Sequence, residues 1–183
     1  MDRRNVEPEE GTRWSGPVTS EDCLSNADPL YSSSKDADFV HSARRTLPRR
    51  GRTAFDAYAD LAAVVPAWFD ALMRVRNAGM KAVGMKDLGS LGAVSRNAPV
   101  LPGHRAGIFT VLSSDADCLL MEDNDRHLRV QLALRWDSSL NQDELIISTV
   151  VHVHNAFGRA YMVPVAPTHR LIMPLLLGRL GRQ

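Results

Sequence analysis

The sequence is poor in cysteine. Its 183 residues include two, Cys23 and Cys118, which lie far apart in the chain. Two cysteines in such different surroundings exclude a disulfide framework and a zinc site built from cysteines. Unpaired thiols fit a reducing compartment, and we therefore expect a cytoplasmic protein.

Long hydrophobic runs are also missing. A helix that spans a membrane needs about 18 apolar residues in succession. The nearest approach, residues 161–177, is broken by His169, Arg170 and three prolines. The first ten residues contain no apolar stretch of the kind found in signal peptides. The sequence thus predicts neither a membrane span nor a secretion signal.

Neither positive nor negative charge is in excess. The chain has 22 Lys and Arg against 21 Asp and Glu, a formal net charge of +1 at pH 7. This balance does not favour nucleic acid or an anionic membrane as a partner. Five arginines do gather within residues 44–52. They fit either an anion-binding patch or the solvated end of a strand, and we favour the strand end.

The last forty residues contain a strand followed by a long apolar helix. Residues 145–154 are β-branched or aliphatic at nearly every position and include no Gly or Pro, as in a β-strand. Asn155 interrupts this run and is suited to cap a helix. Apolar residues then recur at helical spacing, at positions 157, 161, 165, 172 and 176. Such a helix buries its apolar face by lying across a sheet.

The preceding chain alternates between strand and helix patterns. We predict strands at 36–47, 106–113, 118–122 and 127–136, and helices at 54–64 and 66–83. Thr53, with Asp56 three residues later, forms a capping box at the start of the first helix. Short turns between the last strands imply antiparallel pairing. Apolar and polar residues alternate in 127–136, so one face of the sheet meets a core and the other meets water.

Two segments lack such patterns. Residues 1–34 are polar and aperiodic, which predicts a disordered N-terminal arm and leaves 35–183 as one domain. Residues 84–105 are rich in Gly and Pro and predict a long loop. The whole pattern predicts an α+β domain in two layers, with an antiparallel sheet packed on helices.

Five short segments carry a resemblance to a known family: 66–76, 107–111, 122–128, 153–161 and 167–172. Together with the order of elements, they resemble a bacterial family known as a domain of unknown function. That family is similar to the START and polyketide-cyclase superfamily, also called SRPBCC. The resemblance implies the helix-grip fold: a curved antiparallel β-sheet packed on a long C-terminal α-helix, here with two helices after the first strand. It also implies an apolar cavity between sheet and helix, and no established reaction.

Two strand histidines are candidate metal ligands. His152 and His154 share one face of their strand, and His127, Glu122 and Asp123 lie in the neighbouring strands. The other face of that strand is the better core face, and the spacing matches no metal-binding motif. We predict no metal and no cofactor.

His169 lies beside the buried stripe of the C-terminal helix. It is either a ligand contact or general base, or a core histidine bonded to a backbone carbonyl or to Tyr161. We predict that the protein binds an apolar or amphipathic small molecule between the sheet and this helix, with Thr149 and His169 as polar contacts. The predicted ligand-binding residues are Trp68, Leu72, Leu132, Trp136, Thr149, Val151, Tyr161 and His169.

Two alternatives stay open. The first is a cyclase- or lyase-type enzyme that uses the same cavity, with His169 as its acid–base residue. The second is a structural or partner-binding domain with a filled core, in which the 84–105 loop and the basic 44–52 edge contact a protein. The sequence does not decide whether the protein is an enzyme, and it does not give the oligomeric state.

Overall fold

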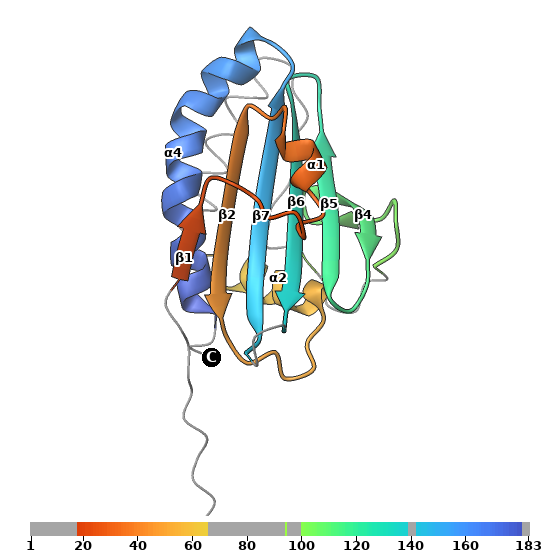
Figure 1. The fold of residues 1–183 in the computed structure, drawn as a ribbon. Helices are drawn as coiled ribbons and strands as arrows, with labels where there is room; N and C mark the ends of the chain where they lie inside the picture. Colours follow the sequence, from red (N-terminus) through yellow and green to blue (C-terminus); the bar gives the residue numbers. More distant parts are fainter. Residues whose placement is uncertain (1–17, 66–93, 95–99, 139–141, 181–183) are drawn as a thin grey trace, which may run out of the picture.

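The computed structural model describes residues 18–65, 94, 100–138 and 142–180 (Figure 1). Within these residues, seven strands form one antiparallel sheet in the order β1-β2-β7-β6-β5-β4-β3. The strands are β1 (Val18–Glu21), β2 (Phe39–Thr46), β3 (Arg105–Ala106), β4 (Phe109–Ser114), β5 (Cys118–Asn124), β6 (Leu128–Asp137) and β7 (Glu144–Val153). The helices are α1 (Tyr31–Ser34), α2 (Ala54–Ala63) and α4 (Ala156–Arg179).

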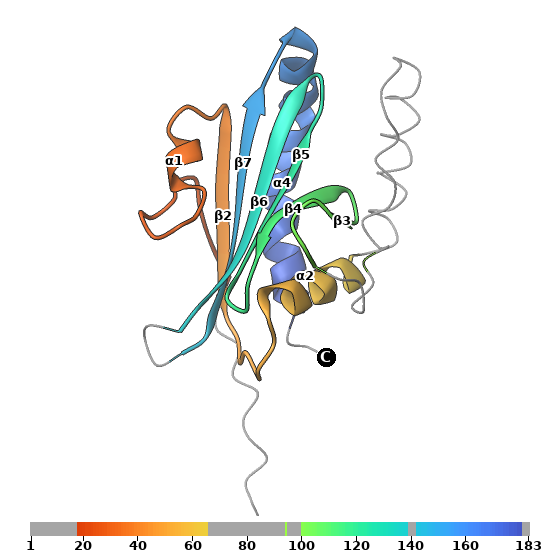
Figure 2. The same ribbon diagram turned by 90° about the vertical axis from the view of Figure 1, so that its right-hand side faces the viewer.

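Among the described residues, α4 and α2 cover one face of the sheet. α4 packs against β1, β2 and β7, and α2 packs against β5 and β6. Figure 2 shows α4 along one side of the curved sheet and α1 on the opposite side. The chain therefore has the predicted α+β helix-grip fold, with a long C-terminal helix against a curved antiparallel sheet. The second predicted helix, 66–83, lies outside the described residues.

The register of the central strands explains which side chains meet the helices. Ala43 on β2 pairs with Ile147 on β7. Ile147 in turn pairs with Leu134 on β6, and Leu134 pairs with Leu119 on β5. Paired residues on neighbouring strands project to the same face. All four side chains are buried in one cluster with residues of α2 and α4, so this row forms the centre of the core.

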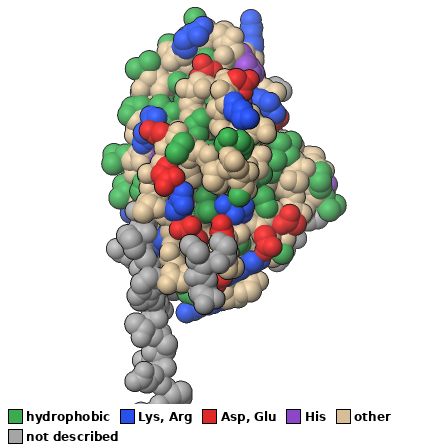
Figure 3. Space-filling model, viewed as in Figure 1, with side chains coloured by type: hydrophobic (Ala, Val, Ile, Leu, Met, Phe, Trp, Pro, Cys, Tyr) green, Lys and Arg blue, Asp and Glu red, His purple; other side chains and the backbone are tan. Residues whose placement is uncertain are grey.

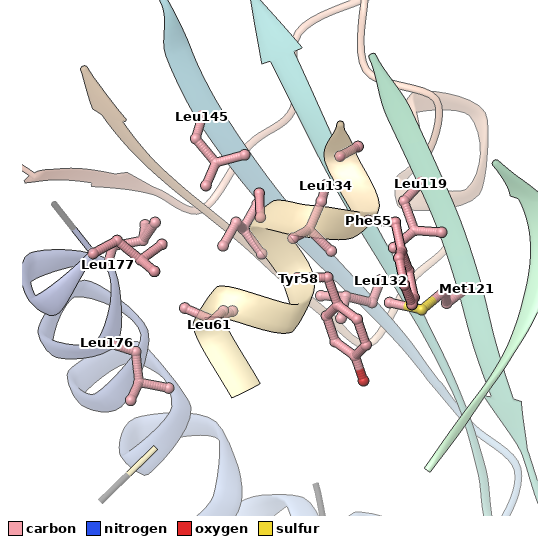
Figure 4. Packing of buried hydrophobic residues seen from close by; sticks show 14 of the residues in the cluster. Phe55, Tyr58, Leu61, Leu119, Met121, Leu132, Leu134, Leu145, Leu176 and Leu177 are labelled. Carbon is pink, nitrogen blue, oxygen red and sulfur yellow. The ribbon is translucent and has the colours of Figure 1, made fainter. Parts of the chain in front are cut away.

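α2 closes one end of the core. Figure 4 shows Phe55 and Tyr58 directed into a cluster that includes Met121 and Leu132. The Tyr58 hydroxyl donates to the carbonyl of Ala106 at 3.0 Å. Burial raises the pKa of Tyr58, so the phenol is neutral and remains a donor. We refer to this region, around Tyr58, as the α2 end of the core.

Both long helices begin at the caps that the sequence predicts. The hydroxyl of Thr53 accepts from the Asp56 amide at 3.1 Å, and the Asp56 carboxylate accepts from the Thr53 amide at 2.8 Å, which confirms the capping box. Asn155 accepts from the Gly158 amide at 3.0 Å. Gly158 is also required by packing, because a Cβ there would collide with the carbonyl oxygen of His127.

The other end of α4 is held by a buried arginine. Arg45, 6% exposed, donates through Nη1 to the carbonyls of Leu177, at 2.6 Å, and of Leu180. The last carbonyls of a helix have no donor within the helix, and a positive charge there also complements the helix dipole. Arg45 thus fixes the C-terminal turn of α4 to β2.

Three prolines lie inside α4 without ending it. Pro164 and Pro167 are exposed, on the side of the helix that faces away from the sheet. The carbonyls four residues earlier lose their usual helical donors, and on this side water can replace them. In the described part of the chain, no helix combines the length and the apolar character that crossing a membrane requires.

Residues 18–34 belong to the arm that the sequence predicts to be disordered, but they contain β1 and α1. Each has four residues, too few for a periodic pattern to appear in the sequence. They are stabilised by contacts with distant parts of the chain: β1 pairs with β2, and the connection to α1 crosses the sheet. Residues 1–17 lie outside the described residues.

This N-terminal segment partly covers the outer face of the sheet, which the sequence predicts to meet water. Leu30 is 2% exposed and packs against Ala133 and Val150. The buried carboxylate of Asp28 accepts from the hydroxyl of Ser148 at 2.5 Å. The outer face therefore carries a small second core.

The predicted strand 106–113 is a hairpin in the structure. β3 ends at Ala106 and β4 begins at Phe109. Gly107 lies between them with φ of 64°, a left-handed conformation that favours glycine. Of the predicted loop 84–105, the structure describes residues 94 and 100–105.

Candidate functional site

His169 lies on α4 and points toward the sheet. Its Nε2 is 3.4 Å from Oγ1 of Thr149 on β7. Its Nδ1 is buried and has no hydrogen-bond partner among the described residues. The structure thus brings together the two residues that the sequence predicts as polar contacts of a ligand.

A second histidine, which the sequence analysis missed, faces His169 from β2. His41 is 2% exposed and pairs directly with Thr149 across the two strands. Its ring centroid is 5.2 Å from that of His169, and the two rings are perpendicular. The rings of Phe39 and His169 meet edge to face, with their centroids 5.6 Å apart. We call these four residues, Phe39, His41, Thr149 and His169, the histidine site.

One sequence signal does point to His41. Residues 39, 41 and 43 alternate along the first predicted strand, and 39 and 43 are apolar. Strand alternation therefore places residue 41 on the same inward face. A histidine on the core face of one strand, opposite a threonine on the core face of another, marks a polar position inside an apolar layer.

Both imidazoles of the site are neutral at pH 7. Burial is the main cause that lowers the pKa of His169 from 6.5 to about 4, and His41 and Arg170 act in the same direction. Burial also lowers the pKa of His41, against the opposing effect of the Asp22 carboxylate and together with that of Arg170. A neutral imidazole carries one donor and one acceptor nitrogen, so each ring can serve in either role.

Arg170 and the N-terminal segment close one side of the histidine site. The Arg170 guanidinium lies 4.7 Å from the ring centroid of Phe39, and its Nε donates to Asp22 at 2.9 Å. Asp22 directly follows β1. No local pattern in the sequence indicates this contact, which depends on residues 148 positions apart.

Three more predicted residues surround the histidine site. Leu132 on β6 is the strand partner of Thr149 and is buried. Val151 pairs with Phe39, and the half-buried Tyr161 of α4 packs against the apolar cluster that contains both. Five of the predicted residues, on β6, β7 and α4, therefore lie close together in the structure: Leu132, Thr149, Val151, Tyr161 and His169.

Trp136 does not belong to this group. It lies near the C-terminal end of β6, and the guanidinium groups of Arg49 and Arg52 lie 5.8 and 5.6 Å from its ring. It fills the α2 end of the core. Trp68 and Leu72 lie outside the described residues.

A known protein family matches the part of the chain that contains the histidine site. A family described as "Protein of unknown function (DUF2867)" matches residues 33–176. The chain belongs to this family. The match runs from α1 to the last turns of α4, so it includes every residue of the histidine site. No curated protein and no solved structure matches the chain. The likeness to the START superfamily stays a prediction.

In this DUF2867 member, the three histidines considered above as metal ligands support the sheet and its turns. His127 contacts Asn155, the cap of α4, at 3.1 Å. His152 contacts Asp36 at 3.4 Å on the outer face, and His154 is exposed. In the part of the chain that the structure describes, no three His, Cys, Asp or Glu side chains gather as metal ligands do.

Four of the five arginines of 44–52 are engaged by protein groups, and Arg50 is exposed. Arg49 forms an ion pair with Asp117 at 2.5 Å, and Arg52 with Asp60 at 3.0 Å. Each acid neutralises the charge that an external anion would need. These contacts favour the strand-end interpretation of the cluster.

Proposed function

We propose that this protein binds an apolar or amphipathic small molecule between its sheet and α4, at the histidine site. Thr149 and His169 contact the polar group of the molecule. Leu132, Val151 and Tyr161 contact its apolar part. The proposal places the protein in the cytoplasm, where its free thiols, Cys23 and Cys118, are kept reduced.

The observation that carries this proposal is the buried Nδ1 of His169, which lacks a hydrogen-bond partner among the described residues. Leaving a buried polar atom unpaired costs about 1–3 kcal/mol, and native proteins keep few such atoms. The atom lies in an apolar layer beside a second neutral histidine, His41. A ligand with one hydrogen-bonding group and an apolar body relieves this cost and matches the surroundings.

The lowered pKa of His169 places binding ahead of the cyclase- or lyase-type enzyme. A general base works best when its pKa lies near the working pH. With a pKa of about 4, the neutral ring of His169 is a poor base at pH 7 and remains a good hydrogen-bond partner. A partner-binding domain with a filled core is the third candidate, and it predicts that no small molecule is bound.

The proposal is tested by native mass spectrometry of the full chain purified from its own host. We expect a second mass series, offset from the protein mass by one small molecule. The offset disappears when the protein is denatured before injection. A single series at the bare protein mass would contradict binding and favour the filled core.

A matched pair of variants locates the bound molecule. His169→Gln removes the imidazole from the histidine site, and His154→Gln makes the same change at an exposed position. We expect His169→Gln to lose the bound mass and His154→Gln to keep it. Equal retention by both variants would place the ligand elsewhere on the protein.

A further inference from the structure

The side of α4 that faces away from the sheet is also apolar. Val163, Pro167, Leu171 and Leu175 recur at every fourth position, and we call them the outer stripe. Val163 is 74% exposed, Leu171 68% and Leu175 57%. Figure 3 shows hydrophobic side chains along the edge of the molecule where Figure 1 places α4. A helix that is apolar on both sides is normally covered on both.

The charge on α4 has one sign. Its 24 residues include Arg159, Arg170 and Arg179, and no Asp or Glu. Arg170 is paired with Asp22, whereas the side chain of Arg159 is exposed. The near-neutral balance of the whole chain therefore conceals a local excess of positive charge beside the outer stripe.

We propose that the outer stripe docks on the surface of an anionic lipid membrane, with α4 lying parallel to that surface. Val163, Leu171 and Leu175 enter the boundary between headgroups and acyl chains. Arg159 and Arg179 contact the anionic headgroups. α4 lies on the membrane and does not cross it. The net charge of the whole chain, +1, does not favour such a partner, but it does not describe the charge of a single helix.

A second copy of the chain fits this surface less well. Two copies would bring together helices that carry arginines and no acids, and like charges at the rim of an interface oppose association. The area is also small. The stripe is about 18 Å long and a helix about 10 Å wide, which gives roughly 180 Å² against about 800 Å² per partner in a standard interface.

The experiment is cosedimentation of the full chain with two kinds of large unilamellar vesicles. One kind is phosphatidylcholine alone, and the other is equal parts phosphatidylcholine and phosphatidylglycerol. We expect binding to the anionic vesicles that falls as salt is added, because salt screens the arginine contacts. Failure to bind the anionic vesicles at low salt would overturn the proposal.

Variants with a matched control assign binding to the outer stripe. Leu171→Gln and Leu175→Gln should each weaken vesicle binding roughly tenfold, and Arg159→Gln roughly fivefold. Leu101→Gln should leave it unchanged. Leu101 is 56% exposed, close to the 57% of Leu175. It precedes β3, which is the edge strand opposite to β1, and so lies far from α4. Unchanged melting temperatures confirm that the variants are folded.

Two results would overturn the assignment. In one, the stripe variants and Leu101→Gln bind vesicles equally well, which would place the contact elsewhere. In the other, the native chain does not bind vesicles, and light scattering shows that it is a dimer which the substitution Leu171→Gln dissociates. The outer stripe would then be an interface between copies.

Discussion

The two ends of the layer between the sheet and the helices differ in how their polar groups are satisfied. At the α2 end, the Tyr58 hydroxyl donates to the carbonyl of Ala106 at 3.0 Å. At the histidine site, the contact between His169 and Thr149 is long, at 3.4 Å, and the other ring nitrogen has no partner among the described residues. The α2 end also contains a buried donor without a partner among the described residues, Nε1 of Trp136, but the guanidinium groups of Arg49 and Arg52 lie against that ring. The histidine site instead holds its unpaired nitrogen beside a second neutral imidazole, and a neutral imidazole can donate or accept.

The comparison predicts its largest effect for Tyr58→Ala. Tyr58 is 2% exposed, and removing a buried aromatic ring costs about 3–5 kcal/mol of unfolding free energy. Tyr58→Phe keeps the ring and loses the hydrogen bond to Ala106, so it should cost only about 1 kcal/mol. Urea denaturation at pH 7 measures both. Similar losses for the two variants would mean that the hydrogen bond, and not the packing, stabilises the α2 end.

Acid should lower the stability of the protein by protonating the histidine site. The pKa of His169 is about 4 in the folded protein and near 6.5 when unfolded, so between these values the unfolded chain binds the extra proton. This contribution to stability is fully present above pH 6.5 and is lost as the pH falls toward 4. The loss is roughly 3 kcal/mol. The pKa of His41 is lowered as well and adds to the loss in the same direction.

The variant His169→Phe isolates this effect, because the carboxylates that also titrate near pH 4 are common to both proteins. Denaturant midpoints at pH 7 and pH 4.5 should differ less for the variant than for the native chain. If the denaturant midpoints of the native chain and the variant change equally with pH, His169 is not held neutral in the folded state.

Gly158→Ala should shift α4 away from the sheet. A Cβ at this position meets the carbonyl oxygen of His127, which is backbone and cannot rotate aside. We expect a loss of about 1–3 kcal/mol, measured by thermal or urea unfolding. Gly178→Ala, later in the same helix, has open space around the new Cβ and should be neutral or slightly stabilising. If the two substitutions have the same effect, the close approach at Gly158 does not position the helix.

The smallest expected effect has the opposite sign. His169→Leu replaces a half-buried ring, which has one unpaired buried nitrogen and one long contact to Thr149, by an apolar side chain of similar reach, so the free energy of unfolding at pH 7 should stay the same or rise by about 1 kcal/mol. The same variant should lose the bound molecule seen by native mass spectrometry. A clear loss of stability in the ligand-free protein would make His169 a structural residue and remove the contrast with Tyr58.

The elements that the sequence predicts are those with a sustained period. The alternation in β6, the unbroken β-branched run of β7 and the caps at Thr53 and Asn155 are visible in the residues alone, and each is confirmed. β1 and α1 were missed because four residues contain no period, and because their stability depends on contacts such as that between Asp28 and Ser148. Such contacts join positions that nothing in the sequence connects.

The candidate site was predicted in part for a similar reason. Strand alternation and helix spacing bring Thr149 and His169 to the same layer, and the structure confirms that they meet. His41 is not among the predicted site residues, although the alternation of Phe39, His41 and Ala43 along the first strand places it on the inward face. Trp136 shares a face of β6 with Leu132, but that face extends along the whole strand, and alternation alone does not say which end of the strand lies near α4.

The most direct test is a high-resolution crystal structure of the protein purified from its own host without added ligands. We predict a bound small molecule between α4 and the sheet, with a polar atom within hydrogen-bond distance of Nδ1 of His169. Apolar side chains packed against this ring, with Nδ1 bonded to another protein group, would contradict the proposed binding site.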